Sequence, residues 1–197
     1  MAAVRVINRP MTSSVFHMIG NETIQLSDLE TVLTAIGTDG GAGYSFSGNS
    51  VTATSAKFSS VLPGQYLIIT SSENTGENDG SYKVASVAQD GTSLTVEGNF
   101  VTNAADTTAS FSANLEPTII GASITQVWHG SVGAGAYWSI TRNSNIVGIY
   151  TQTNNIDYAG DGIAMIQDSG SSAVCALNSA TDGFLMLEFQ KILQGTG

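Results

Sequence analysis

The sequence predicts a mainly β protein, with a β-sandwich or jelly-roll-like main domain that carries one short helix, plus an inserted small β-barrel. Three observations predict this class. Only 11% of the 197 residues are charged, against roughly 25% in an average soluble domain. Glycine occurs 22 times and Ser and Thr are abundant, which favours strands and tight turns over helices. Short apolar runs recur about every ten residues with turn signals between them, as in sandwiches and barrels.

The first predicted element is a β-hairpin. Two apolar runs, residues 15–19 and 23–26, flank Gly20 and Asn21. This dipeptide readily adopts the positive φ angles that a two-residue hairpin turn needs. We therefore expect these two strands to pair with one another.

A short helix is predicted next, over residues 27–36. Ser27 would be its N-cap and Glu30, three residues later, completes a capping box. Gly37 would end the helix. The apolar residues between them recur at helical spacing: Leu29, Val32, Leu33 and Ile36.

The chain then divides into an inserted module and the rest of the main domain. Residues 44–114 hold five or six short apolar runs separated by Gly, Pro, Asn and Asp, which predicts a small β-barrel. Residues 1–43 and 115–197 form the discontinuous main domain, because the first segment alone has too little apolar surface to fold. Its last strand is predicted over residues 184–192, with a helix as the less favoured interpretation.

Charge and cysteine content exclude several functions. Six Lys and Arg against sixteen Asp and Glu give a net charge of −10, so no basic surface for nucleic acid or an anionic membrane is expected. No apolar stretch is long enough to span a membrane, and residues 1–11 do not resemble a secretory signal. Cys175 is the single cysteine, which excludes an intrachain disulfide and a multi-cysteine zinc site.

Few residues suit catalysis. His17 and His129 are the two histidines, and Ser131 follows His129 closely, but the Gly-x-Ser-x-Gly turn of many serine hydrolases is absent. We interpret His129 as structural and Cys175, within an apolar run, as a small buried side chain. The sequence therefore predicts neither an enzyme nor a bound cofactor.

An acidic run offers the best candidate for a metal. Residues 73–80 (Glu-Asn-Thr-Gly-Glu-Asn-Asp-Gly) could supply oxygen ligands to Ca²⁺, although their spacing does not match a helix-loop-helix calcium loop. A solvated hairpin is the favoured interpretation, and calcium binding stays open. Asp157 and Asp161 form a weaker version of the same pattern. No metal site is assigned.

Aromatic residues gather in the C-terminal part of the chain: Trp128, Tyr137, Trp138, Tyr150 and Tyr158. Exposed aromatic rings can stack on sugars, but such residues more often fill a core or a subunit interface. As candidate contacts with a partner or a glycan we take Trp128, Tyr137, Trp138 and Tyr158.

Part of the inserted region resembles a known module. Residues 58–69, the Asn-Asp-Gly-Ser-Tyr-Lys-Val stretch at 78–84, and residues 92–96 are similar to a small β-barrel module of tailed-bacteriophage virion proteins. Residues 136–142 and 184–188 resemble small structural proteins of cyanophage-like viruses. Neither resemblance brings a catalytic residue with it.

The resemblance implies a non-enzymatic virion structural protein, made in the host cytoplasm. It implies most directly a capsid decoration (cement) protein that binds the major capsid protein or other virion proteins and stabilises the phage head. A homo-oligomer, with a trimer favoured, follows from clustering on lattice symmetry axes. The N-terminal residues 1–11, with Arg5 and Arg9, would be a capsid-contact arm. The alternatives are a neck, tail or fibre component, or a carbohydrate-binding adhesin.

Overall fold

The structure is a computed structural model that describes residues 4–37, 43–158, 163–166, 172–180 and 182–195. Strands hold 61% of the chain and helices 4%, which confirms the predicted mainly β class. The chain forms two compact units. Unit 1 comprises Met1–Glu30 and Ile119–Leu193, and unit 2 comprises Thr31–Thr118 and Gln194–Gly197.

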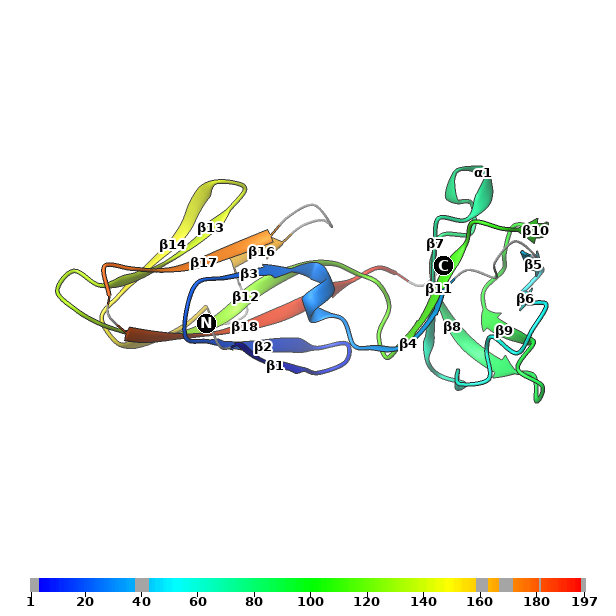
Figure 1. Ribbon diagram of the computed structural model, residues 1–197, viewed down its shortest axis with the longest axis horizontal. Coiled ribbons are helices and arrows are strands. Elements are labelled where there is room, and N and C mark those ends of the chain that lie inside the picture. Colours follow the sequence, from blue (N-terminus) through cyan, green and yellow to red (C-terminus); the bar gives the residue numbers. More distant parts are fainter. Residues whose placement is uncertain (1–3, 38–42, 159–162, 167–171, 181, 196–197) are drawn as a thin grey trace. The chain divides into compact units, whose positions relative to one another are not determined.

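Unit 1 contains two antiparallel sheets that form two layers (Figure 1). The six-stranded sheet has the order β1-β2-β18-β12-β15, and β16 also pairs with β12. Its strands are β1 (Val4–Asn8), β2 (Ser13–Met18), β12 (Ile119–Val132), β15 (Asn154–Asp157), β16 (Ile163–Ile166) and β18 (Asp182–Leu193). The four-stranded sheet has the order β14-β13-β17-β3. Its strands are β3 (Glu22–Gln25), β13 (Tyr137–Arg142), β14 (Asn145–Thr151) and β17 (Ser172–Asn178).

The core of unit 1 lies between these two sheets. Phe16 and Leu187 from the six-stranded sheet and Trp138 and Ile140 from the four-stranded sheet belong to one buried cluster. Alternate residues of each strand point to this cluster, because successive side chains of a strand point to opposite faces. Unit 1 is therefore a β-sandwich.

Unit 2 is built on one antiparallel sheet of eight strands in the order β10-β5-β6-β9-β8-β7-β11-β4. The strands are β4 (Val32–Gly37), β5 (Tyr44–Ser47), β6 (Ser50–Thr52), β7 (Tyr66–Thr70), β8 (Gly80–Val87), β9 (Ser93–Glu97), β10 (Asn103–Asp106) and β11 (Ser110–Asn114). A short helix, α1 (Glu73–Gly76), follows β7.

This sheet curves around its own aromatic core. Tyr44 in β5 and Phe111 in β11 lie five positions apart in the strand order, yet their ring centroids are 4.1 Å apart. A flat sheet would place these strands more than about 20 Å apart, since neighbouring strands are separated by about 4.8 Å. The two end strands, β10 and β4, do not pair with each other in the described part of the chain. The unit is barrel-like without a closed strand ladder.

The predicted helix over residues 27–36 is wrong. A short 3-10 helix covers Leu26–Leu29, and the remaining residues form β4, which pairs with β11. Val32, Thr34 and Ile36 are β-branched and alternate along this stretch, a pattern that suits a strand. The Glu116 carboxylate accepts a hydrogen bond from the Thr31 backbone at 2.8 Å and holds the start of the strand.

The predicted hairpin is wrong as well. Its first strand, β2, pairs with β1 and β18, whereas its second strand, β3, pairs with β17 in the other sheet. Neither Gly20 nor Asn21 has a positive φ. The Asn21 side-chain oxygen accepts a hydrogen bond from the Leu177 backbone at 2.8 Å, and the chain thus crosses from one sheet to the other.

The boundaries of the units differ from the predicted domain limits at 43/44 and 114/115. The divisions fall after Glu30 and after Thr118, because β4 pairs with β11 and so belongs to the curved sheet. The predicted final strand over residues 184–192 is confirmed as part of β18.

Candidate binding surface on the six-stranded sheet

The outer face of the six-stranded sheet is the strongest candidate for a functional surface. Phe16 and Met18 in β2 and Leu187 in β18 are buried in the core. The residues between them therefore point away from the core. This sets His17 and Met186 on the outer face.

The strand register aligns outward side chains in rows across the sheet. Met186 pairs with His17 on one side and with Trp128 on the other, and His17 pairs with Arg5. One row thus crosses β1, β2, β18 and β12. The next row is Ile7, Val15, Glu188 and Gln126. Side chains that are far apart in sequence meet on this face because each strand is contributed by a different segment.

The part of this face formed by β1, β2 and β18 is hydrophobic and exposed. Ile7 is 45% exposed and Phe184 38%. A hollow of about 320 Å³ is lined by Arg5, Ile7, Val15, His17, Phe184 and Met186. A single exposed apolar residue is ordinary, but a contiguous group around a hollow is a candidate interaction surface.

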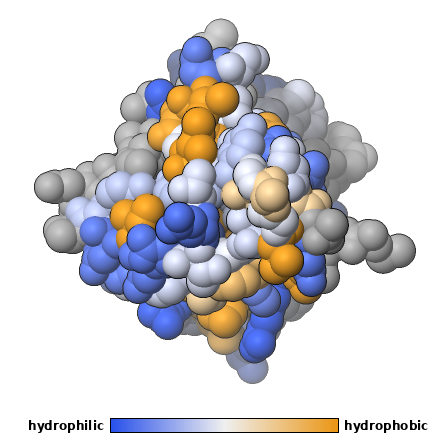
Figure 2. Space-filling view, turned by 90° about the vertical axis from the view of Figure 1, so that its left-hand side faces the viewer, coloured by the Kyte–Doolittle hydropathy of each residue, from blue (hydrophilic) through white to orange (hydrophobic). Residues whose placement is uncertain are grey.

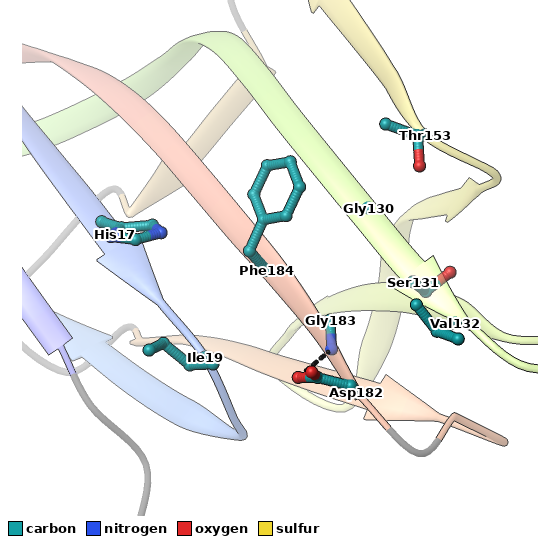
Figure 3. Close-up of a pocket in the computed structure, with 9 residues that line it drawn as sticks. All are labelled: His17, Ile19, Gly130, Ser131, Val132, Thr153, Asp182, Gly183 and Phe184. Carbon is teal, nitrogen blue, oxygen red and sulfur yellow. Dashed lines mark hydrogen bonds between the residues drawn. The ribbon is translucent and has the colours of Figure 1, made fainter.

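A second hollow of about 400 Å³ adjoins the first and shares His17 and Phe184 with it. Figure 3 shows the Phe184 ring standing off β18, between His17 on β2 and Gly130 on β12. The other residues around this hollow are Ile19, Ser131, Val132, Thr153, Asp182 and Gly183. Seen end-on, unit 1 presents several separate hydrophobic areas among polar ones (Figure 2).

The lack of a side chain at Gly130 explains why the Phe184 ring can lie against the backbone of β12. A Cβ on Gly130 would lie 2.6 Å from Cε1 of Phe184, so glycine lets the ring cover the backbone of β12. From the core side, the Trp138 indole nitrogen donates a hydrogen bond to the Gly130 carbonyl at 3.1 Å. Gly130 is thus held between two aromatic side chains.

The polar groups of this hollow do not form a catalytic arrangement. Asp182 accepts a hydrogen bond from the Gly183 backbone at 2.8 Å, and the buried hydroxyl of Ser131 has no partner in the described part of the chain. Proton transfer needs a base within hydrogen-bond reach of a nucleophile, and no described contact joins these groups to His17. The surface suits the burial of apolar groups better than chemistry.

Comparisons with protein families, with curated proteins and with solved structures found no match to this chain. In the described part of the chain, no helix has both the length and the hydrophobicity needed to cross a membrane.

Of the residues considered for catalysis, His129 and Cys175 are buried, whereas His17 is partly exposed on the outer face. His129 is 1% exposed, its ring centroid lies 5.3 Å from that of Tyr150, and burial lowers its pKa. Cys175 is also buried, and burial raises its pKa to about 12. A thiol with such a pKa is not a nucleophile near neutral pH, because the thiolate is the reactive form.

The four aromatic candidates do not share a face. Trp138 is fully buried, and the Tyr158 hydroxyl lies 3.3 Å from that of Tyr150, against the core. Trp128 points out of the six-stranded sheet, while Tyr137, next to the inward Trp138, points out of the four-stranded sheet. The four candidate contacts with a partner or a glycan therefore do not lie together on one surface.

The acidic run at residues 73–80 forms α1 and the turn after it, in the connection of the hairpin made by β7 and β8. Its carboxylates accept local hydrogen bonds: Glu73 from Thr107, and Asp79 from the Ser71 and Ser72 backbone. The hydrogen bonds from Thr107 lower the pKa of Glu73. No group of three potential metal ligands occurs among the described residues. Asp157 lies in β15, and Asp161 lies outside the described residues.

The N-terminal segment is an edge strand of its own sheet. β1 pairs with β2 along its whole length, from Val4 with Met18 to Asn8 with Ser14. Arg5 contributes to the outer face, and Arg9 follows in the turn toward β2. Val4–Asn8 of the predicted capsid-contact arm thus form a strand whose second edge is unpaired among the described residues.

Sequence reasoning missed Ile7, Val15, Phe184 and Met186 as surface candidates. One signal was present: residues 184–187 (Phe-Leu-Met-Leu) are apolar on both faces of β18. Such a strand is typically covered on both sides. In unit 1 the core covers only one of the two faces of β18.

Proposed function

We propose that this chain is a non-enzymatic structural protein of a phage virion, a decoration protein that binds the head through the outer face of the six-stranded sheet. The observation that carries the proposal is the exposed hydrophobic surface around Ile7, Phe184 and Met186, on a sheet whose other face already packs a core. Burying such a surface against a partner is favourable by about 25 cal/mol per Å².

The charges around this surface indicate the character of the partner. Glu188 and Asp157 lie on either side of Gln126 in the neighbouring strands. Asp182 lines the second hollow, and Arg5 lies in β1, at the opposite edge of the sheet. The whole chain has a net charge of −10. A partner with an apolar centre and mainly basic surroundings would complement this face. The surface of a capsid subunit is the proposed partner.

The resemblance of the inserted region to a phage virion module supports the virion location. Repeated attachment to a symmetric capsid favours an oligomer, and a trimer is the proposed state. A neck, tail or fibre position uses the same kind of surface, so it is distinguished by where the protein binds and not by its fold.

The test is sedimentation of the purified chain with separated heads and tails of the phage whose genome encodes it. The expected result is binding to heads, lost in Ile7→Asp and retained in Ile149→Asp. Ile149 is 57% exposed and points out of the four-stranded sheet, so it controls for the added charge. Binding to tails alone, or equal binding by both variants, would overturn the proposal.

A further inference from the structure

Unit 1 has a second opening, on the core side of its two sheets. A slot of about 300 Å³ lies between β1, the edge strand of the six-stranded sheet, and β3, the edge strand of the four-stranded sheet. Its walls are Val4, Val6, Asn8 and Phe16 from the first sheet, and Glu22, Thr23, Ile24 and Asp28 from the second sheet and the turn after it.

The slot exists because one sheet is wider than the other. Val4 and Val6 pair with Met18 and Phe16, two core residues, so they lie on the core side of the sheet. Yet Val4 is 41% exposed and Val6 40%. Ile24 of β3 packs in the same core as Phe16, whereas no described strand beyond β3 covers β1. The four-stranded sheet is one strand short at this edge.

Part of the backbone at this edge is also available for pairing, although the Gln25 N–H already donates a hydrogen bond to the Asp28 carboxylate at 2.8 Å. β3 pairs with β17 along one side, and no strand of the described chain pairs with its other side. An unpaired strand edge is a template for the addition of another strand. A strand added to β3 at the usual separation would lie over β1, with alternate side chains directed at Val4 and Val6.

The charge of the slot indicates which residues an added strand should carry. Glu22 and Asp28 are its charged residues, and none of its lining residues is basic. Glu22 is partly buried and shares the inward side of β3 with Ile24. A partly buried carboxylate gains most from an opposite charge nearby. The added strand should therefore carry a Lys or Arg among its apolar residues.

We propose that this slot accepts one extended strand of a partner polypeptide, with alternating apolar residues and one basic residue, added beside β3. A second copy of the chain is a poorer occupant, because its own β1 is already paired with β2 and forms the wall of the slot. The proposal goes beyond the proposed function: it concerns a different surface and specifies a linear segment.

The test begins with a library of random peptides of about nine residues, the upper range of an ordinary strand, selected on the immobilised full-length chain. Selected peptides are resynthesised and their dissociation constants measured by titration calorimetry. We expect alternating apolar residues and at least one Lys or Arg. Selection of no peptides, or of peptides without this pattern, would overturn the proposal.

Three variants locate the binding. Val6→Asp should weaken peptide binding about tenfold or more, since it adds an uncompensated charge to the apolar wall. Glu22→Lys should weaken binding of basic peptides and favour acidic ones. Ile149→Asp, on the opposite edge strand of the four-stranded sheet, should bind like the unmodified chain. Unchanged binding by Val6→Asp and Glu22→Lys, with circular dichroism showing both folded, contradicts the proposal.

These readouts are independent of the proposed function. Peptide binding to the slot can succeed while sedimentation with heads fails, which would retain the strand site and reject the capsid role. The reverse result would reject the strand site alone.

Discussion

Trp138 connects the core of unit 1 to the candidate binding surface on its six-stranded sheet. The side chain is fully buried and donates its hydrogen bond to Gly130, the residue over which Phe184 lies. We predict that Trp138→Ala lowers the free energy of unfolding by about 3–5 kcal/mol, because it leaves a large cavity. Trp138→Phe should cost less, as it keeps most of the apolar volume. Urea denaturation measures both, and an Ala variant of unchanged stability would contradict the buried placement.

His129 should make unit 1 sensitive to acid. Burial lowers its pKa in the folded state, whereas an unfolded histidine has a pKa of about 6.5. Below that pH the unfolded chain binds more protons, so the stability contributed above pH 6.5 is lost as pH falls toward the lowered folded pKa.

The measurement is the free energy of unfolding at several pH values below 7, for the unmodified chain and for His129→Phe. Both lose stability in acid as carboxylates protonate, but the unmodified chain should lose more just below pH 6.5. If the free energy of unfolding falls equally steeply with pH for both proteins just below pH 6.5, His129 is not responsible for the loss of stability.

At the scale of elements, Gly91 shows why a turn between two strands requires glycine. Its φ is +68°, and a Cβ there would lie 2.9 Å from the Ser59 backbone. Gly48 also has a positive φ, +57°, but a Cβ there would meet nothing within 4 Å. Gly48→Ala should therefore cost about 1 kcal/mol from backbone strain alone.

Gly91→Ala should cost clearly more than Gly48→Ala, because Ser59 must move as well. Thermal unfolding of the two variants measures the difference, and equal melting temperatures would argue against the close approach at Gly91.

The elements that sequence reasoning found are those with a local signal. β18 was predicted because Phe184 to Ile192 are mostly apolar. The helix over 27–36 was wrong because Val32, Leu33 and Ile36 fit a helical and an extended pattern equally well. Pairing with β11, more than 70 residues away, decides between them.

At the scale of the whole molecule, the candidate binding surface could not be predicted for the same reason. Arg5, His17, Met186 and Trp128 form one row, but they come from four strands whose order and register depend on distant pairing. Composition anticipated a low-charge surface. Which apolar residues remain exposed follows only from the pairing, because a shift by one residue would reverse the two faces of a strand.

The two units have separate cores. The buried cluster around Trp138 and the one around Phe111 share no residue. We predict that residues 31–118 produced alone fold, with dispersed amide signals in a nitrogen–proton correlation spectrum. Phe111→Asp in the same fragment should unfold it and serves as the control. A collapsed spectrum for the unmodified fragment would mean that unit 2 needs the rest of the chain.

The position of β18 has a consequence for how the chain folds as it leaves the ribosome. β18 lies between β2 and β12 and pairs with both, yet it is translated after every other described strand. Unit 2 can fold as soon as its own segment has emerged. Strands β1 and β2 precede β18 by more than 160 residues, so they remain without it until that whole segment has been synthesised. During that interval their apolar edges are exposed in the cell. The six-stranded sheet of unit 1 is completed only when β18 is inserted between β2 and β12.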